Sequence, residues 1–339
     1  MYLLVSIDHM KVLFTLIFVI ITNLCLSQSV SEYKRFKHFE ILTGNDTIKY
    51  HIYSQNEIAD KTKILLYIQG SAAIPMFDVR KEKESISVVS TIPFDLNGIP
   101  EDYAFIIVSK KCVPFATINE TYNPPKCYYE NESLDYRVWQ CNNVINHITN
   151  TVIKNSEKIV ALGHSEGSDV VAKLGTVNKK ITRIGFWSGS GNTQYNDFAL
   201  LIRKETAEGK ADEATSLKKL ESLYAQIEDI EKDPTSIDKF WLDNTYKRWH
   251  EFSEPAVENL LKINIPIFVA IGTKDQAVPF ESSLIIKTEF IRHHKDNLTF
   301  RIYPDLDHGF ETVPNTKNEE PKDRWMDIFS EFMEWANKE

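Results

Sequence analysis

Ser165 is the residue of this sequence whose surroundings most resemble those of a catalytic nucleophile. It is the centre of the segment Gly-His-Ser-Glu-Gly at positions 163–167, which fits the pattern Gly-x-Ser-x-Gly. An apolar run precedes this segment and a helical pattern follows it. A serine on a tight strand-to-helix turn needs glycine neighbours to avoid clashes, and the helix N-terminus offers N–H groups and partial positive charge to a developing oxyanion. The pattern with these flanks predicts an activated serine.

An acid and a histidine follow Ser165 in the order that a catalytic triad requires. Asp275 lies in Gly-Thr-Lys-Asp-Gln-Ala-Val-Pro (272–279), and His308 lies in Asp-Leu-Asp-His-Gly-Phe (305–310). Each of these segments comes directly after an apolar, strand-like run. We expect His308 to take the serine proton as general base, and Asp275 to hold the imidazole in the required tautomer.

Two neighbouring residues are weaker candidates for catalysis. Asp307 is adjacent to His308 in the sequence, so its carboxylate cannot easily reach the far ring nitrogen. His164, within the serine turn, is expected to be structural.

These motifs resemble the α/β-hydrolase superfamily, and in particular its branch of secreted esterases, dienelactone hydrolases and prolyl-oligopeptidase-like proteins. The resemblance extends over residues 38–338 apart from one insertion, and the order Ser…Asp…His is that of the superfamily. It implies an oxyanion hole built from the backbone N–H groups of Glu166 and Ser71. Ser71 ends the segment Tyr-Ile-Gln-Gly-Ser, in which Gln69 stands where the family commonly has histidine.

The hydrophobic pattern independently predicts an α/β fold with a mostly parallel central sheet flanked by helices, because short β-branched runs alternate with helical periods. We expect a hairpin at 38–53, strands at 63–68, 103–109, 158–162, 181–187, 266–271 and 298–303, and helices at 134–155, 166–174, 282–294 and 324–336. Residues 192–262 are charged and helical, which predicts a cap or lid inserted into a catalytic domain of residues 28–191 and 263–339. The alternative is a peripheral decoration away from any site.

Aromatic side chains near these segments are candidates for the walls of a substrate pocket, although aromatic residues more often belong to a core. The candidates are Phe77, Trp187, Trp241 and Trp249. The side chain of Glu166 has two interpretations. It can orient a helix or bind a cationic group of the substrate, or it can be a first-turn carboxylate favoured by the helix dipole.

The N-terminus predicts export. Residues 1–27 contain a lysine, a short apolar run and small residues, as in a signal peptide cleaved after Ser27. An uncleaved anchor is the alternative, and either Met1 or Met10 can be the start. After cleavage we expect no stable membrane insertion. An oxidising compartment permits a disulfide among Cys112, Cys127 and Cys141, with the pairing left open.

The composition excludes several partners. A net charge of −9 and a pI near 5.6 disfavour nucleic acid. No His-x-His or His-Glu-x-x-His pattern is present, so a metal-dependent hydrolase is disfavoured and no cofactor is expected. The leading hypothesis is a serine hydrolase of the carboxylesterase kind, acting on a small-molecule acyl substrate. A peptidase or amidase, an acyltransferase and a catalytically silent binding protein are the alternatives, and the oligomeric state stays open.

Overall fold

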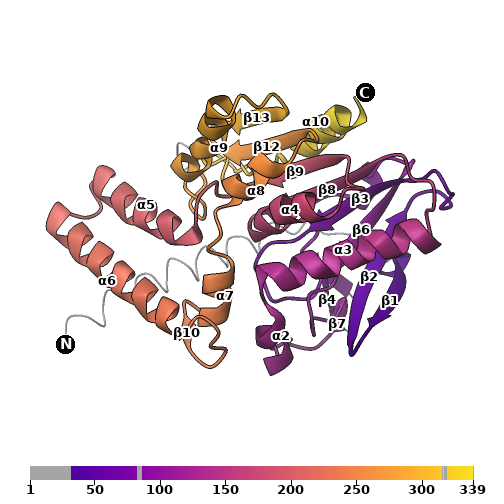
Figure 1. The fold of residues 1–339 in the computed structure, drawn as a ribbon, viewed down its shortest axis with the longest axis horizontal. Helices are drawn as coiled ribbons and strands as arrows, with labels where there is room; N and C mark the ends of the chain where they lie inside the picture. The colour runs from indigo at the N-terminus through magenta and orange to yellow at the C-terminus, as the bar shows by residue number, and fades with distance from the viewer. Residues whose placement is uncertain (1–31, 82–85, 315, 317–318, 339) are drawn as a thin grey trace.

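The computed structural model describes residues 32–81, 86–314, 316 and 319–338 (Figure 1). The predicted signal peptide of residues 1–27 lies outside these residues. Within them, no helix is both long enough and apolar enough to cross a membrane.

A central sheet of eight strands organises the chain, in the order β1-β2-β6-β3-β8-β9-β12-β13. The strands are β1 (Lys37–Thr43), β2 (Asp46–Ser54), β3 (Lys63–Ile68), β6 (Tyr103–Val108), β8 (Ile159–His164), β9 (Arg183–Trp187), β12 (Ile267–Gly272) and β13 (Leu298–Tyr303). β1 and β2 form the predicted antiparallel hairpin, and β2 also runs antiparallel to β6. From β6 to β13 every pairing is parallel. The strands in the middle of the sheet are apolar runs because both of their faces are buried.

Helices and a small second sheet cover the two faces of the central sheet. The helices are α2 (Lys126–Asn131), α3 (Leu134–Thr151), α4 (Glu166–Val177), α8 (Ala256–Lys262), α9 (Phe280–Arg292) and α10 (Trp325–Asn337), with 3-10 turns η1 (Glu32–Arg35) and η2 (Leu96–Gly98). Apolar residues of α3, α4, α8 and α9 share one core with one face of the sheet. Those of α10 fill the opposite core together with the second sheet, which comprises β4 (Phe77–Lys81), β5 (Ile86–Ser90) and β7 (Ala116–Ile118).

The segment between β9 and β12 is helical, as predicted. It contains α5 (Gln194–Ala207), α6 (Glu213–Lys232), a two-stranded ribbon of β10 (Phe240–Trp241) and β11 (Asn244–Thr245), and α7 (Tyr246–Glu251) before α8. Figure 1 shows α5 and α6 as a helical pair that projects away from the sheet, with α7 returning toward it. Phe198, Ile202, Leu223, Ile230, Tyr246 and Trp249 form a separate apolar cluster within α5–α7. The residues of α8, which also fall within the predicted range 192–262, are buried in the main core instead.

One disulfide joins Cys112 to Cys127, and Cys141 is a free, buried thiol. The bridge connects the loop between β6 and β7 to the start of α2. It therefore fixes a segment near the carboxyl edge of the sheet.

Candidate active site

The carboxyl ends of the parallel strands bring the predicted catalytic segments to one edge of the sheet. Ser165 follows β8, Asp275 follows β12 and His308 follows β13. Ser71 follows β3, which is the direct neighbour of β8. Ligand and catalytic sites of open parallel sheets lie at this edge, because the loops that follow the strands converge there.

Ser165 adopts the strained backbone that the glycine pattern predicts. Its φ is 57°, in the left-handed region that serine rarely occupies, and its N–H donates to the Trp187 carbonyl at 2.9 Å. A Cβ on Gly163 would lie 2.0 Å from the Gly167 carbonyl oxygen, and one on Gly167 would lie 2.1 Å from the Ile68 carbonyl oxygen. Only glycine fits at either position, so the two glycines allow a sharp turn that is packed against β3.

His308 and Asp275 form a buried hydrogen-bonded pair. His308 Nδ1 lies 2.7 Å from Asp275 Oδ2, while Asp275 Oδ1 accepts from the N–H groups of Ala277 and Val278, each at 2.8 Å. The two residues are 8% and 2% exposed. Burial alone would lower the pKa of His308, but the charge of Asp275 and its hydrogen bond outweigh burial and raise that pKa. The pair can hold the ring with Nε2 free to accept a proton.

The histidine loop is fixed against the serine turn through its backbone. The His308 carbonyl oxygen lies 2.9 Å from His164 Nε2 and accepts from Ser188 Oγ at 3.0 Å. Burial, followed by the charge of His308, lowers the pKa of His164 to about 3, so this ring stays neutral. His164 is therefore structural, as expected.

The Ser165 hydroxyl is not hydrogen-bonded to the His308 ring among the residues that the structure describes. Such contacts are often long in free enzymes and tighten when substrate binds. Asp307 is the neighbouring acid that the sequence disfavoured, and its Oδ1 accepts from Gly309 N–H at 2.9 Å and Glu311 N–H at 2.8 Å. Asp307 thus shapes the loop that carries His308.

The loop after β3 lies directly over the nucleophile. A Cβ on Gly70 would lie 3.4 Å from Ser165 Oγ, so Gly70, the residue before Ser71, lies beside the serine. Glu166 is the first residue of α4, where backbone N–H groups have no partner within the helix. Of the two residues predicted to supply the oxyanion hole, Glu166 follows Ser165 directly, and Ser71 follows the glycine that lies beside the serine.

Two of the four candidate pocket residues, Phe77 and Trp187, belong to the core that contains α10 and the second sheet, and the other two belong to the apolar cluster of the insertion. Phe77 is fully buried beside Phe36 and Phe115, and Trp187 is fully buried beside Phe310, Trp325 and Phe332. Trp241 and Trp249 pack together on Phe198 inside the insertion. Core packing accounts for these rings without a substrate.

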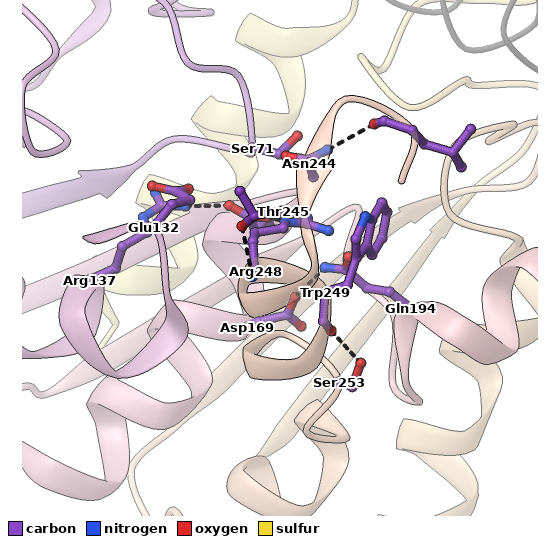
Figure 2. A network of polar contacts seen from close by, with 12 residues as sticks. Ser71, Glu132, Arg137, Asp169, Gln194, Asn244, Thr245, Arg248, Trp249 and Ser253 are labelled. Atoms are coloured by element: carbon purple, nitrogen blue, oxygen red, sulfur yellow. Dashed lines mark hydrogen bonds and ion pairs between the residues drawn. The ribbon is translucent and has the colours of Figure 1, made fainter. Parts of the chain in front are cut away.

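Sequence reasoning missed a buried cluster of charges beside the nucleophile. Its members are Lys110, Glu132, Arg137, Glu166, Asp169 and Arg248, each 7% exposed or less. Arg137 donates to Glu166 Oε1 at 2.8 Å, and Arg248 Nε donates to Glu166 Oε2 at 2.8 Å. Figure 2 shows Arg248 between the labelled residues of the insertion on one side and Arg137 and Glu132 on the other. These residues come from distant parts of the chain, so no local spacing could have revealed them.

No metal centre competes with this site in the described part of the chain, where no group of three or more His, Cys, Asp or Glu side chains could hold an ion.

Comparisons with known proteins agree with this architecture. The model of the dienelactone hydrolase family matches residues 242–338, the part of the chain that contains Asp275 and His308. An acylaminoacyl peptidase of Pyrococcus horikoshii has a similar structure, with a TM-score of 0.55 and 12% identity over 90% of this chain. This chain spans only 42% of that peptidase. Comparison with curated protein sequences finds no match.

Two smaller proteins are similar over most of their own length. An esterase of Pyrococcus furiosus has a TM-score of 0.52 and 13% identity, with 89% of this chain and 91% of the esterase covered. A putative dienelactone hydrolase of Klebsiella pneumoniae has a TM-score of 0.54 and 10% identity, with 90% of this chain and 98% of that protein covered. The chain therefore has the α/β-hydrolase fold, which confirms the fold class that the sequence predicted.

Proposed function

We propose that the protein is a serine hydrolase that cleaves a carboxylic ester of a small acyl substrate. The observation that carries this proposal is the buried His308–Asp275 pair, with 2.7 Å between Nδ1 and Oδ2, together with the hydrogen bond that joins the His308 carbonyl to His164 of the turn carrying Ser165. The strained φ of 57° at Ser165 supports the same assignment, because such strain is kept where the surrounding structure enforces it and often serves catalysis.

Each residue has one role in the proposed reaction. Ser165 Oγ attacks the acyl carbonyl carbon while His308 Nε2 takes the hydroxyl proton, and the carbonyl electrons move onto oxygen. The N–H groups of Ser71 and Glu166 stabilise that oxyanion. When the tetrahedral intermediate collapses, the ester bond breaks and His308 returns the proton to the departing alcohol. Water then attacks the acyl-serine in the same way, which releases the acid and restores Ser165.

Export of the protein is part of the proposal. The signal-like residues 1–27 and the Cys112–Cys127 bridge both support an oxidising compartment outside the cytosol.

The decisive test is labelling of the purified protein with a fluorophosphonate, followed by peptide mapping. We expect one adduct, on Ser165, and none in Ser165→Ala. Ser168→Ala is the matched control, because Ser168 Oγ donates to the Trp187 carbonyl at 2.7 Å and its hydroxyl is fully buried; this variant should still be labelled at Ser165. A folded protein without an adduct on Ser165 would refute the proposal and favour a silent binding protein.

Matched substrates then separate ester from amide chemistry. The measured quantity is the rate of p-nitrophenyl acetate hydrolysis divided by the rate of p-nitroacetanilide hydrolysis. We expect this ratio to be larger with the protein than in uncatalysed hydrolysis. An amide preference would move the assignment to a peptidase or amidase.

A further inference from the structure

The Glu166 carboxylate is the centre of the buried charge cluster. Glu166 is 4% exposed. Its Oε1 accepts a hydrogen bond from Arg137 Nη1 and lies 3.7 Å from Lys110 Nζ, while its Oε2 accepts from Arg248. Arg248 contacts it through both Nε and Nη2. Burial alone would raise the pKa of Glu166, but the charges of Arg248, Lys110 and Arg137 outweigh burial and lower it to about 2. The carboxylate is thus ionised, and its position is set by three cations.

Two of those cations also hold the loop that faces Ser165. Arg137 Nη2 donates to the Gln69 carbonyl at 2.5 Å, and Lys110 Nζ donates to the Ser71 carbonyl at 2.9 Å. These carbonyls belong to the peptides on either side of the one that carries the Ser71 N–H. Because the Glu166 N–H is the other donor of the proposed oxyanion hole, a single ionic network fixes both donors.

The third cation comes from the insertion. Arg248 lies on α7 and stacks on Trp249, with its guanidinium carbon 4.3 Å from the ring centroid. Thr245 Oγ1 accepts from the Arg248 N–H at 3.2 Å and caps the start of α7. Arg248 therefore contacts both the aromatic cluster of the insertion and Glu166, the residue next to Ser165. Figure 2 shows Arg248 with Thr245 and Trp249 of the insertion.

Arg248 adds a third cation to a cluster whose other charges already form pairs. Without Arg248, the cations Lys110 and Arg137 are matched by Glu132 and Glu166. With Arg248 docked, the cluster contains the three cations Lys110, Arg137 and Arg248, and burial raises the pKa of the neighbouring Asp169 carboxyl well above its ordinary value. Arg248 Nη1 and Trp187 Nε1 are the buried side-chain polar atoms that lack a hydrogen-bond partner among the described residues. Docking thus leaves Arg248 Nη1 without a partner, whereas undocking would remove the two Arg248 donors from Glu166 Oε2.

We propose that Arg248 is a positioning residue, and that docking of α7 on Glu166 through Arg248 completes the oxyanion hole. The inference rests on the proposed function, because it assigns the donors of the same site. Arg248 of the docked insertion fixes the Glu166 carboxylate, and this carboxylate fixes Arg137. Arg137 and Lys110 then hold the loop that contains Ser71. When α7 moves away, the nucleophile and the His308–Asp275 pair remain, but the two N–H groups lose their fixed direction.

The test compares Arg248→Met with Arg248→Lys and with Arg203→Met. Arg203 lies on α5 of the same insertion and makes a two-pronged ion pair with Glu213, but its side chain is 45% exposed. It is therefore a matched control for loss of an arginine ion pair. The readouts are kcat and KM for p-nitrophenyl acetate and the rate of fluorophosphonate labelling at Ser165, with circular dichroism to confirm folding.

We expect Arg248→Met to lower kcat and the labelling rate by about 10- to 100-fold, because a misplacement near 1 Å can cost about 100-fold. KM should change less than about threefold, and Arg248→Lys should recover part of kcat because it keeps the charge. Arg203→Met should match the wild type. If Arg248→Met does not fold, Arg248→Lys alone must still show a reduced kcat with an unchanged KM.

Three outcomes would overturn the inference: an unchanged kcat in a folded Arg248→Met or in Arg248→Lys, a raised KM with an unchanged kcat, or an equal loss in Arg203→Met. The second would make Arg248 a substrate-binding residue. All comparisons use a wild-type protein that labels at Ser165. Failure of that labelling would count against the proposed function, whereas the three outcomes above would count against Arg248 alone.

Discussion

Gly70→Ala is a perturbation that reaches Ser165 without replacing any of the proposed catalytic side chains. A Cβ at this position would lie 3.1 Å from Ser165 Cβ, 3.4 Å from Ser165 Oγ and 3.6 Å from the His164 carbonyl oxygen. The first contact is tighter than ordinary van der Waals packing, so the loop or the serine must move by a few tenths of an ångström. That movement would displace the serine side chain or the loop that continues to Ser71.

The expected cost falls on catalysis more than on stability. A displacement near 1 Å can cost about 100-fold in rate, so a shift of a few tenths should lower kcat by roughly tenfold. Mild overpacking costs on the order of 1 kcal/mol, which corresponds to a fall in Tm of a few degrees for a domain of this size. The assay is the pre-steady-state burst with p-nitrophenyl acetate, which isolates acylation of the serine, together with thermal unfolding.

Gly98→Ala is the matched control. Its Cβ would meet the Met326 Cε methyl at 2.3 Å, at the end of a flexible side chain on α10. We expect a comparable change in Tm and a wild-type burst. A burst of normal rate in Gly70→Ala would refute the placement of the Gly70–Ser71 peptide over Ser165, and an equal loss of rate in Gly98→Ala would show that overpacking acts on the whole fold.

Two further predictions concern the acid and the disulfide. The pKa of His308 is raised above its ordinary 6.5, and catalysis needs the neutral ring, so kcat/KM should fall as the pH decreases through a value above 6.5. A fall in kcat/KM that begins only below pH 6.5 in the wild type would contradict the pairing of His308 with Asp275. Asp275→Asn should lower kcat by about 10,000-fold. Replacing Cys112 and Cys127 together by serine opens a loop with a sequence separation of 15, which should lower the free energy of unfolding by about 3 kcal/mol in a chain-entropy model. Urea unfolding of this double variant measures that loss, and an unchanged midpoint would contradict it.

The central sheet was predictable because burial on both faces leaves a direct trace in the sequence. The predicted strand 63–68 coincides with β3, which is buried on both faces. The predicted strand 298–303 coincides with β13, an edge strand that is only partly buried and was recognised by its run of apolar residues. β8 continues to His164, beyond the predicted end at 162, because its pairing with β9 runs through Gly163 to His164↔Trp187. A glycine suggests a strand end in isolation, but here the ladder continues to the turn that carries the serine.

The second sheet left no comparable trace. β4 ends in Arg80 and Lys81, β5 exposes alternate residues and β7 has only 3 residues. Such short segments resemble loop sequence, and their pairing is set by the core beneath them. The segments that contain Ser165, Asp275 and His308 were recognisable because each is a local sequence motif. The cluster around Glu166 instead depends on contacts between α3, α4, α7 and the loop after β6. Those contacts exist only in the folded chain.

The hydrogen bonds at the base of the insertion bear on how such a protein can diversify. The Gly191 carbonyl accepts from the Val257 N–H at 3.1 Å, and the Gly191 N–H donates to the Ser282 carbonyl at 3.3 Å. The insertion thus begins and ends at neighbouring points of the α/β domain, and the Gly191–Val257 hydrogen bond joins its two ends. A segment with tethered ends can be lengthened, shortened or exchanged at small entropic cost, since closure depends only weakly on length. Under the role that we propose for Arg248, a replacement of this segment also needs a cation that reaches Glu166.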